Sequence, residues 1–254
     1  MAFVPVMHTR YTSPTYNPHS LSQRWGLFFT DRILNPLPNG QNPNRQTQIF
    51  RSQLVKSIHT DFQHSFLAFP AIPPMPVKIS DAKAGDLDPA PAAPETAPIL
   101  LPDEISGLDD LAKEVGLDVL ALAVLADVPV YRPRHLELED LVAQWRWLRL
   151  VWSHFCQPEK TEKANNAKDD IFDVASAVRS NRVLAVTRQI DQYRFNIALA
   201  ELRKMFQYLR KSPANRQNPL QLCFIELLRL FCPYIGHELL YRYGAIKSPD
   251  QTES

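Results

Sequence analysis

The 254 residues carry 28 basic and 27 acidic side chains, so the formal net charge at pH 7 is only +1, and a chain of this length can hold one sizeable core or two small ones. No apolar run reaches the roughly 18 residues that a membrane-spanning helix needs, so no membrane span is expected. The three cysteines, Cys156, Cys223 and Cys232, lack CxxC spacing; we expect buried, reduced thiols rather than a zinc site or a disulfide framework.

Charge is unevenly distributed along the chain. The net charge is +5 over residues 1–80, −10 over residues 81–140 and +6 over residues 141–254. Blocks of this kind present separate basic and acidic surfaces.

Residues 1–101 are rich in proline, because 15 of the 22 prolines lie in residues 1–102. This pattern predicts a long, irregular, mostly extended N-terminal extension that is ordered against a larger body. The first residues contain Arg10 and Arg24 but no acidic side chain before Asp31, a composition like that of a mitochondrial transit peptide. We expect a location in the mitochondrial matrix; a basic tail of a cytosolic or plastid protein is the alternative.

Helical patterns begin near residue 102. Gly116 separates predicted helices over residues 108–115 and 117–126, and Pro129 and Pro133 follow them. Asp109 and Asp110 fit the first turn of the earlier helix, as Asp169 and Asp170 fit the start of a later one. The next predicted helix, within residues 136–157, carries one apolar stripe at steps of three and four residues: Leu141, Trp145, Leu148 and Trp152.

The C-terminal part is predicted to be three further helices. One long helix is expected over residues 171–209, and the pattern admits an interruption near Ser180 and Asn181. Helices over residues 220–232 and 234–243 follow, with Gly244 as a C-terminal cap. We therefore predict an all-α, antiparallel helix bundle over residues 102–246, followed by a short tail over residues 247–254.

Basic side chains recur in the predicted bundle and are the candidate RNA contacts, because the planar guanidinium group suits phosphate. The competing interpretation is a solvated helix face that Asp191 and Glu201 partly neutralise. Tyr193, Tyr208, Tyr241 and Tyr243 are expected to be half-buried core residues rather than base-stacking rings. The candidate RNA contacts are Arg179, Arg182, Arg188, Arg194, Arg203, Lys204, Arg210, Lys211 and Arg216.

Two segments carry a resemblance to a known family. The stretches "VTRQIDQYRFNIALAELRKMFQYL" and "ELLRLFCPYIGHELLYRYG" are similar to the helical anticodon-binding domain of class I aminoacyl-tRNA synthetases, of the leucyl type. Tyr234 and His237 depart from the family pattern. The residues that match it are Arg194, Phe195, Asn196, Ala198, Ala200, Pro233, Ile235, Glu238, Leu239, Leu240 and Gly244.

A third stretch resembles the catalytic loop of the same family in degenerate form. "KISDAKAGDLDP", residues 78–89, is similar to the family's "KMSKSKGNVVDP", but Asp81 takes the place of the second lysine and would repel ATP phosphates. A HIGH-type tetrapeptide is also absent from the sequence. The resemblance therefore implies a non-catalytic homologue, and we expect no enzymatic activity, cofactor, metal or small-molecule substrate.

Other pairs of reactive side chains receive structural interpretations. His154 and Cys156 lie two residues apart on a predicted helix and should point to different faces. His237 and Glu238 are expected at the solvated edge of the last helix.

Together these features predict a structural, RNA-binding component of a mitochondrial ribosome. We expect it to contact rRNA through its N-terminal segment and the basic helix region, and neighbouring ribosomal proteins through the acidic segment 81–140. A free tRNA-binding or RNA-processing factor is one alternative. A protein-packing subunit of another mitochondrial complex, without an RNA role, is the other.

Overall fold

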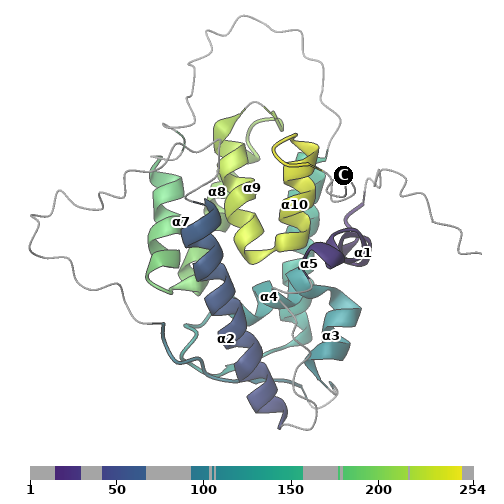
Figure 1. The fold of residues 1–254 in the computed structure, drawn as a ribbon, viewed down its shortest axis with the longest axis vertical. Helices are drawn as coiled ribbons and strands as arrows, with labels where there is room; N and C mark the ends of the chain where they lie inside the picture. Colours follow the sequence, from purple (N-terminus) through teal and green to yellow (C-terminus); the bar gives the residue numbers. More distant parts are fainter. Residues whose placement is uncertain are drawn as a thin grey trace, which may run out of the picture.

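The computed structural model describes residues 15–29, 42–66, 93–102, 105, 107–156, 177, 180–216 and 218–247. Within these ranges the chain forms nine α-helices, one π-helical turn and one pair of two-residue strands. The helices pack around a shared apolar core (Figure 1). The prediction of an all-α fold is confirmed.

The N-terminal part contributes two helices to this core. They are α1 (Pro18–Phe29) and α2 (Pro43–Asp61), and α2 continues as the π-helical turn η1 (Phe62–Phe66). Trp25 of α1 and Phe50 of α2 are each only 1% exposed. The expectation of a mostly extended segment over residues 1–101 is therefore wrong for these two stretches.

Two prolines of this part, Pro18 and Pro43, begin helices. Pro43 occupies the first helical position of α2, where a missing N–H costs nothing and the fixed φ angle favours the helix. The Asn42 side chain caps the same helix by accepting the N–H of Asn44 at 2.9 Å. The degenerate loop over residues 78–89 lies outside the described residues, as does Asp169–Asp170.

The central helices follow the predicted pattern closely. Gly116, at φ 86°, separates α3 (Leu108–Val115) from α4 (Leu117–Leu125), and Asp109 and Asp110 occupy the first turn of α3. In α5 (Leu138–Phe155) the predicted stripe faces inward, with Leu148 and Trp152 fully buried. The parallel strands β1 (Ile99–Leu100) and β2 (Arg134–His135) join the segments that precede α3 and α5.

The long helix predicted over residues 171–209 is broken by a turn. Its parts are α7 (Asn181–Asp191), which Ser180 caps, and α8 (Phe195–Leu209). Tyr193 takes the left-handed φ of 57° in the turn and stacks on His59 of α2, with ring centroids 4.2 Å apart. The contact with α2 thus stabilises this turn, which contains no glycine or proline.

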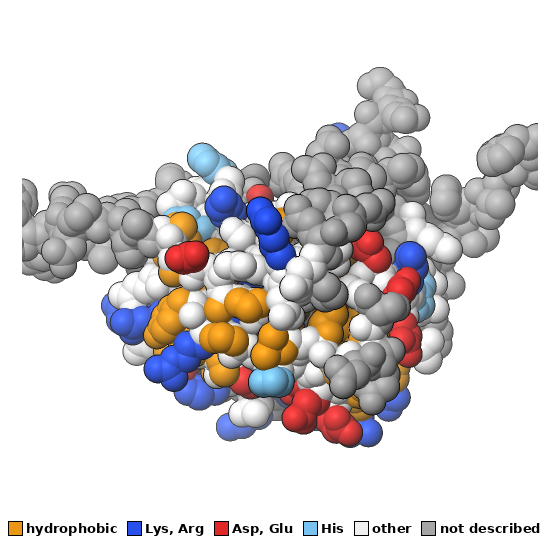
Figure 2. All heavy atoms as spheres, turned by 90° about the horizontal axis from the view of Figure 1, so that it is seen from below, with side chains coloured by type: hydrophobic (Ala, Val, Ile, Leu, Met, Phe, Trp, Pro, Cys, Tyr) orange, Lys and Arg blue, Asp and Glu red, His pale blue; other side chains and the backbone are white. Residues whose placement is uncertain are grey.

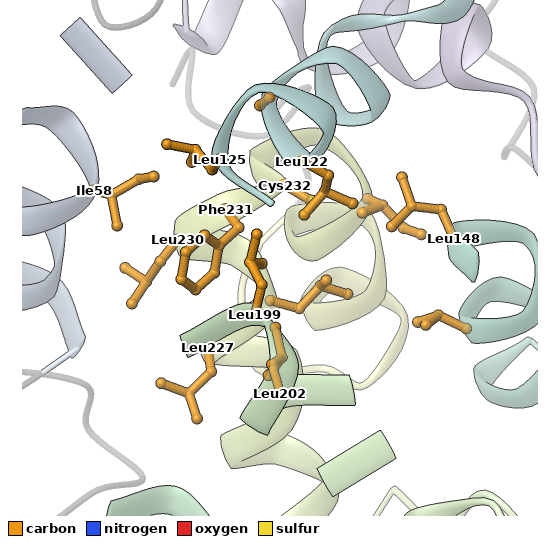
Figure 3. Close-up of a cluster of buried hydrophobic side chains, with 14 of the residues drawn as sticks. Ile58, Leu122, Leu125, Leu148, Leu199, Leu202, Leu227, Leu230, Phe231 and Cys232 are labelled. Atoms are coloured by element: carbon orange, nitrogen blue, oxygen red, sulfur yellow. The ribbon is translucent and has the colours of Figure 1, made fainter. Parts of the chain in front are cut away.

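The last two helices are those predicted, with each bound shifted by one residue. They are α9 (Pro219–Phe231) and α10 (Pro233–Arg242), and Gly244 follows at φ 72°. Side chains from α2, α4, α5, α8 and α9 meet in one apolar cluster (Figure 3). The cluster includes Ile58, Leu122, Leu125, Leu148, Leu199, Leu202, Leu227, Leu230 and Phe231.

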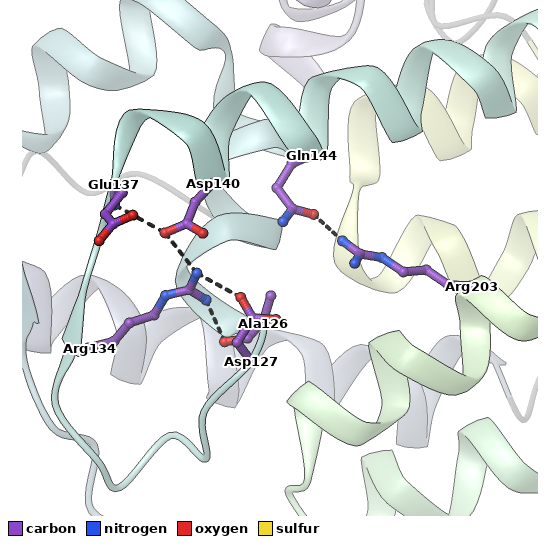
Figure 4. A network of polar contacts seen from close by, with 7 residues as sticks. All are labelled: Ala126, Asp127, Arg134, Glu137, Asp140, Gln144 and Arg203. Carbon is purple, nitrogen blue, oxygen red and sulfur yellow. Dashed lines mark hydrogen bonds and ion pairs between the residues drawn. The ribbon is translucent and has the colours of Figure 1, made fainter.

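Buried arginines hold the irregular segments in place. Arg51 of α2 has no exposed surface and donates hydrogen bonds to the carbonyls of Arg132 at 2.7 Å and Ala97 at 3.2 Å. Arg134 donates to the carbonyl of Ala126 at 2.6 Å and forms ion pairs with Asp127 and Asp140 (Figure 4). Because buried carbonyls need donors, these two side chains hold the connection between α4 and α5 and link it to the segment around Ala97.

Asp118 caps α10 from another helix. Its buried carboxylate accepts the N–H of Ile235 at 2.8 Å and that of Tyr234 at 3.3 Å. These N–H groups have no acceptor within α10 itself. Burial raises the pKa of Asp118 to about 7, although the two N–H groups oppose the rise.

The Asp118→Asn variant should alter the pH dependence of stability. Because folding raises the pKa of Asp118 from 3.8, the folded state binds the extra proton, so this group's stabilisation falls as pH rises from about 4 to about 7. Asparagine keeps one acceptor oxygen and does not titrate. We expect the difference in free energy of unfolding, variant minus wild type, to increase by about 1–3 kcal/mol when the pH is raised from 5 to 8. Urea denaturation at both pH values measures this; a pH-independent difference would contradict it.

Candidate nucleic-acid interface

Four cations and one tyrosine lie exposed on α8, its C-terminal end and the start of α7. This surface, called the basic face, consists of the stripe Lys204, Tyr208 and Lys211, of Arg182 stacked on Tyr208, and of Arg210 on the adjoining side, where its guanidinium carbon lies 5.8 Å from the centroid of the Phe206 ring. Residues 204, 208 and 211 follow one another at steps of four and three, so they form one stripe on α8 and the turn after it. The opposite side of α8 is buried in the core.

Arg182 and Tyr208 form the pair that links α7 to α8. The guanidinium carbon of Arg182 lies 3.8 Å from the centroid of the Tyr208 ring, and Tyr208 is 46% exposed. A guanidinium stacked on a ring keeps its N–H edge available for phosphate. The expectation of Tyr208 as a half-buried core residue is therefore wrong, whereas Tyr193, Tyr241 and Tyr243 are partly buried, as predicted.

Arg203 has a different environment from the other candidates. Its guanidinium donates a hydrogen bond to the side-chain oxygen of Gln144 (Figure 4) and lies 5.4 Å from the centroid of the Trp147 ring. Burial lowers its pKa. Because these contacts tie α8 to α5, Arg203 is better explained as an interhelical link than as a phosphate contact.

Local carboxylates neutralise the basic face only in part. Lys204 Nζ lies 2.6 Å from Glu201 Oε1, in agreement with the competing interpretation in which Glu201 partly neutralises this face. The Lys204 side chain is nevertheless 68% exposed. An exposed ion pair of this kind contributes about 0–1 kcal/mol, so the lysine is readily shared with another anion. Arg210 and Lys211 complement the negative end of α8.

The structure separates the remaining candidates from the basic face. Arg188 is exposed on α7, six residues after Arg182, and Arg194 is exposed at the N-terminal end of α8. Arg194 and Arg210 flank the two ends of α8, so they lie about 24 Å apart along its axis. Arg216 is exposed in the connection to α9, and Arg179 lies outside the described residues.

The candidate catalytic pair is not assembled. His154 packs against Phe206 of α8, whereas the Cys156 thiol lies near Arg242 and Glu238 of α10. Burial raises the pKa of Cys156 to about 12 and lowers that of His154. A reactive cysteine requires the opposite shift. All three cysteines are free, and Cys223 and Cys232 are buried, as predicted, whereas Cys156 is only partly buried.

Sequence reasoning missed a buried charge network between α1 and α10. Glu238 is 1% exposed; it accepts the Trp25 indole N–H at 3.0 Å and pairs with Arg24 at 3.1 Å and with Arg242 at 2.9 Å. His237 packs against the Trp25 ring and is 8% exposed. The expectation that His237 and Glu238 lie at a solvated edge is wrong, because α1 covers them.

Neither a protein-family model nor a solved structure matches this chain. The resemblance to the synthetase anticodon-binding domain therefore stays a prediction. Among the described residues no cluster of three or more His, Cys, Asp or Glu side chains could hold a metal ion. In the same part of the chain, no helix combines the length and apolar character needed to cross a membrane.

Proposed function

We propose that this chain is a non-catalytic, RNA-binding structural component of a ribonucleoprotein particle, and that the particle is a mitochondrial ribosome. The observation that carries the proposal of RNA binding is the basic face. It combines exposed cations with an exposed ring carrying a stacked guanidinium group. Phosphate attracts the cations in a sequence-independent way, and an exposed ring offers a platform for an unpaired base.

The choice of a mitochondrial ribosome rests on sequence features. These are the N-terminal composition and the resemblance to a degenerate synthetase domain. The position of α1 adds a condition to this proposal: Tyr16 and Trp25 are buried in the core and Arg24 pairs with Glu238. If an N-terminal segment is removed on import, cleavage must therefore occur before Tyr16 for the fold to stay intact.

Reversing three charges of the basic face should weaken RNA binding. In the variant Lys204→Glu, Arg210→Glu, Lys211→Glu we expect the affinity for a structured RNA, with tRNA and an rRNA hairpin as probes, to fall at least about tenfold. The slope of log K against log salt should decrease by about 2–3, because three phosphate contacts are lost. Filter binding at several salt concentrations measures both. Arg203 is left unchanged because it holds α5.

A matched control separates this surface from the overall charge. Arg45 and Lys56 of α2 and Lys113 of α3 are also exposed, and their reversal to Glu changes the net charge by the same amount. We expect this control to bind RNA nearly as tightly as wild type. Equal losses in the two triple variants would mean that the basic face is not an RNA-binding site.

Sedimentation decides between the particle and the alternatives. We expect the chain in a mitochondrial lysate to migrate with a ribosomal particle in a magnesium-containing gradient and to leave that position after ribonuclease treatment. Migration as a small species would favour a free RNA-binding factor. A large complex that resists ribonuclease would favour the protein-packing role.

A further inference from the structure

A second surface of the molecule is an apolar groove between α3, α5 and the residues leading into α1. Its volume is about 570 Å³, within the range of sites that bind ligands. The apolar lining includes Tyr16, Leu111, Val115, Leu138, Val142 and Trp145. We refer to it as the α3/α5 groove.

The rim of the groove exposes large apolar side chains to solvent. Leu138 is 54% exposed and Val142 is 44% exposed, and they lie four residues apart on α5. Leu111 and Val115 have the same spacing on α3. Apolar rows on two helices form ridges and a groove that match the side-chain spacing of a third helix.

The helix segments that form the groove carry more carboxylates than cations, although the Arg149 guanidinium carbon lies 5.3 Å from the centroid of the Trp145 ring. Glu114 lines it, and Glu137 and Glu139 flank Leu138 in the sequence. Asp109 and Asp110 occupy the first turn of α3, where Lys113 pairs with Asp110. His19 also lines the groove, with its Nε2 3.1 Å from the carbonyl oxygen of Glu114. Seen from the end of the molecule that holds α3, hydrophobic side chains are exposed near the centre of the surface, Asp and Glu side chains lie mostly below and to the right of them, and Lys and Arg side chains lie mainly to the left (Figure 2).

We propose that the α3/α5 groove binds a basic amphipathic helix of a protein partner. The apolar stripe of such a helix would cover Leu138, Val142 and Trp145, and its flanking lysines or arginines would face the surrounding carboxylates. This site lies on other elements than the basic face and does not depend on RNA binding. The proposal specifies which kind of protein would contact the acidic segment 81–140.

The test uses the full chain and a synthetic peptide of about 18 residues, long enough to form a helix, with a leucine stripe flanked by lysines. A second peptide keeps the stripe but carries glutamates at the flanks. Fluorescence anisotropy should show that the lysine peptide binds at least about tenfold more tightly than the glutamate peptide, and that its affinity falls with salt. Equal affinity for both peptides would overturn the proposal.

Two variants of α5 locate the binding site. Val142→Asp places a charge in the groove and should weaken lysine-peptide binding at least about tenfold. Leu150→Asp is the matched control, because Leu150 is 46% exposed on the same helix but is not part of the groove lining; its affinity should stay unchanged. Circular dichroism verifies that both variants are folded. Unchanged binding by Val142→Asp would overturn the proposal.

Other occupants of the groove give different results. A second copy of the chain would appear as a concentration-dependent dimer in sedimentation equilibrium that Val142→Asp abolishes. Occupation by the chain's own first 14 residues would appear as peptide binding only after these residues have been removed. Either result would overturn the proposal that a basic amphipathic helix of another protein binds the α3/α5 groove. A monomer that binds the lysine peptide with residues 1–14 present would support it.

Discussion

Replacing Gly236 by alanine is expected to lower the free energy of unfolding by about 3 kcal/mol, although only one methyl group is added. A Cβ at this position would lie 2.4 Å from Arg229 Cα and 2.9 Å from Arg229 N. These are backbone atoms of α9, so no side-chain rotation relieves the clash. Arg229 is itself 8% exposed and pairs with the buried Glu226 at 2.8 Å, which opposes any shift of α9.

Gly107→Ala is the matched control for this substitution. Gly107 precedes α3 with an extended φ of 174°, and nothing lies within 4 Å of a Cβ built there. We expect Gly107→Ala to lower the free energy of unfolding by at most about 1 kcal/mol, since alanine is a poorer helix N-cap than glycine but meets no steric clash at this position. Urea denaturation of both variants measures the difference. Similar stabilities would show that α9 and α10 can separate at little cost.

Glu238→Ala is expected to lower the free energy of unfolding by about 3–5 kcal/mol, because it removes a buried carboxylate from two largely buried guanidinium groups, which are 11% and 21% exposed. Arg24 and Arg242 both pair with this carboxylate, and Trp25 donates its indole N–H to it. Loss of the carboxylate should also release α1 from α10. We therefore expect faster amide hydrogen exchange in residues 18–29 together with the lower midpoint of urea denaturation.

Glu201→Ala tests whether the loss of stability in Glu238→Ala comes from the burial of its ion pairs. Glu201 also pairs with a cation, Lys204, but that lysine is 68% exposed, so its removal should cost less than about 1 kcal/mol and leave the exchange of α1 unchanged. Glu238→Gln retains one acceptor oxygen and should fall between the two. A Glu238→Ala protein as stable as Glu201→Ala would mean that the network contributes little to the fold.

Local signals explain which helices could be predicted from the sequence. Gly116 between two apolar patterns, the stripe of α5 and Gly244 after α10 are properties of neighbouring residues, and all three are found in the structure. The turn between α7 and α8 has no such signal, since Gln192, Tyr193 and Arg194 are not typical turn residues. It depends on His59, which is 134 positions away.

The missed turn also explains what was missed at the candidate site. On one continuous helix Arg182 and Tyr208 would lie about 39 Å apart, whereas the turn brings the guanidinium group onto the ring. Arg203 illustrates the reverse error: its position in the sequence resembles that of Lys204, but Gln144 and Trp147 engage it. Side-chain partners on other helices decided both outcomes, and these could not be read from local periodicity.

The contact between α1 and α10 has a consequence for the order of folding. Trp25 and Glu238 are separated by 213 positions, and a ribosome synthesises the chain from the N-terminal end. Almost the whole chain must therefore be synthesised before Glu238 can pair with Trp25 and Arg24. Because the contact is long-range, we expect it to be among the slowest to form. In a chain that stops before residue 238, α10 is incomplete and does not cover the apolar side of α1. We therefore expect chaperones and proteases to recognise incomplete chains at α1.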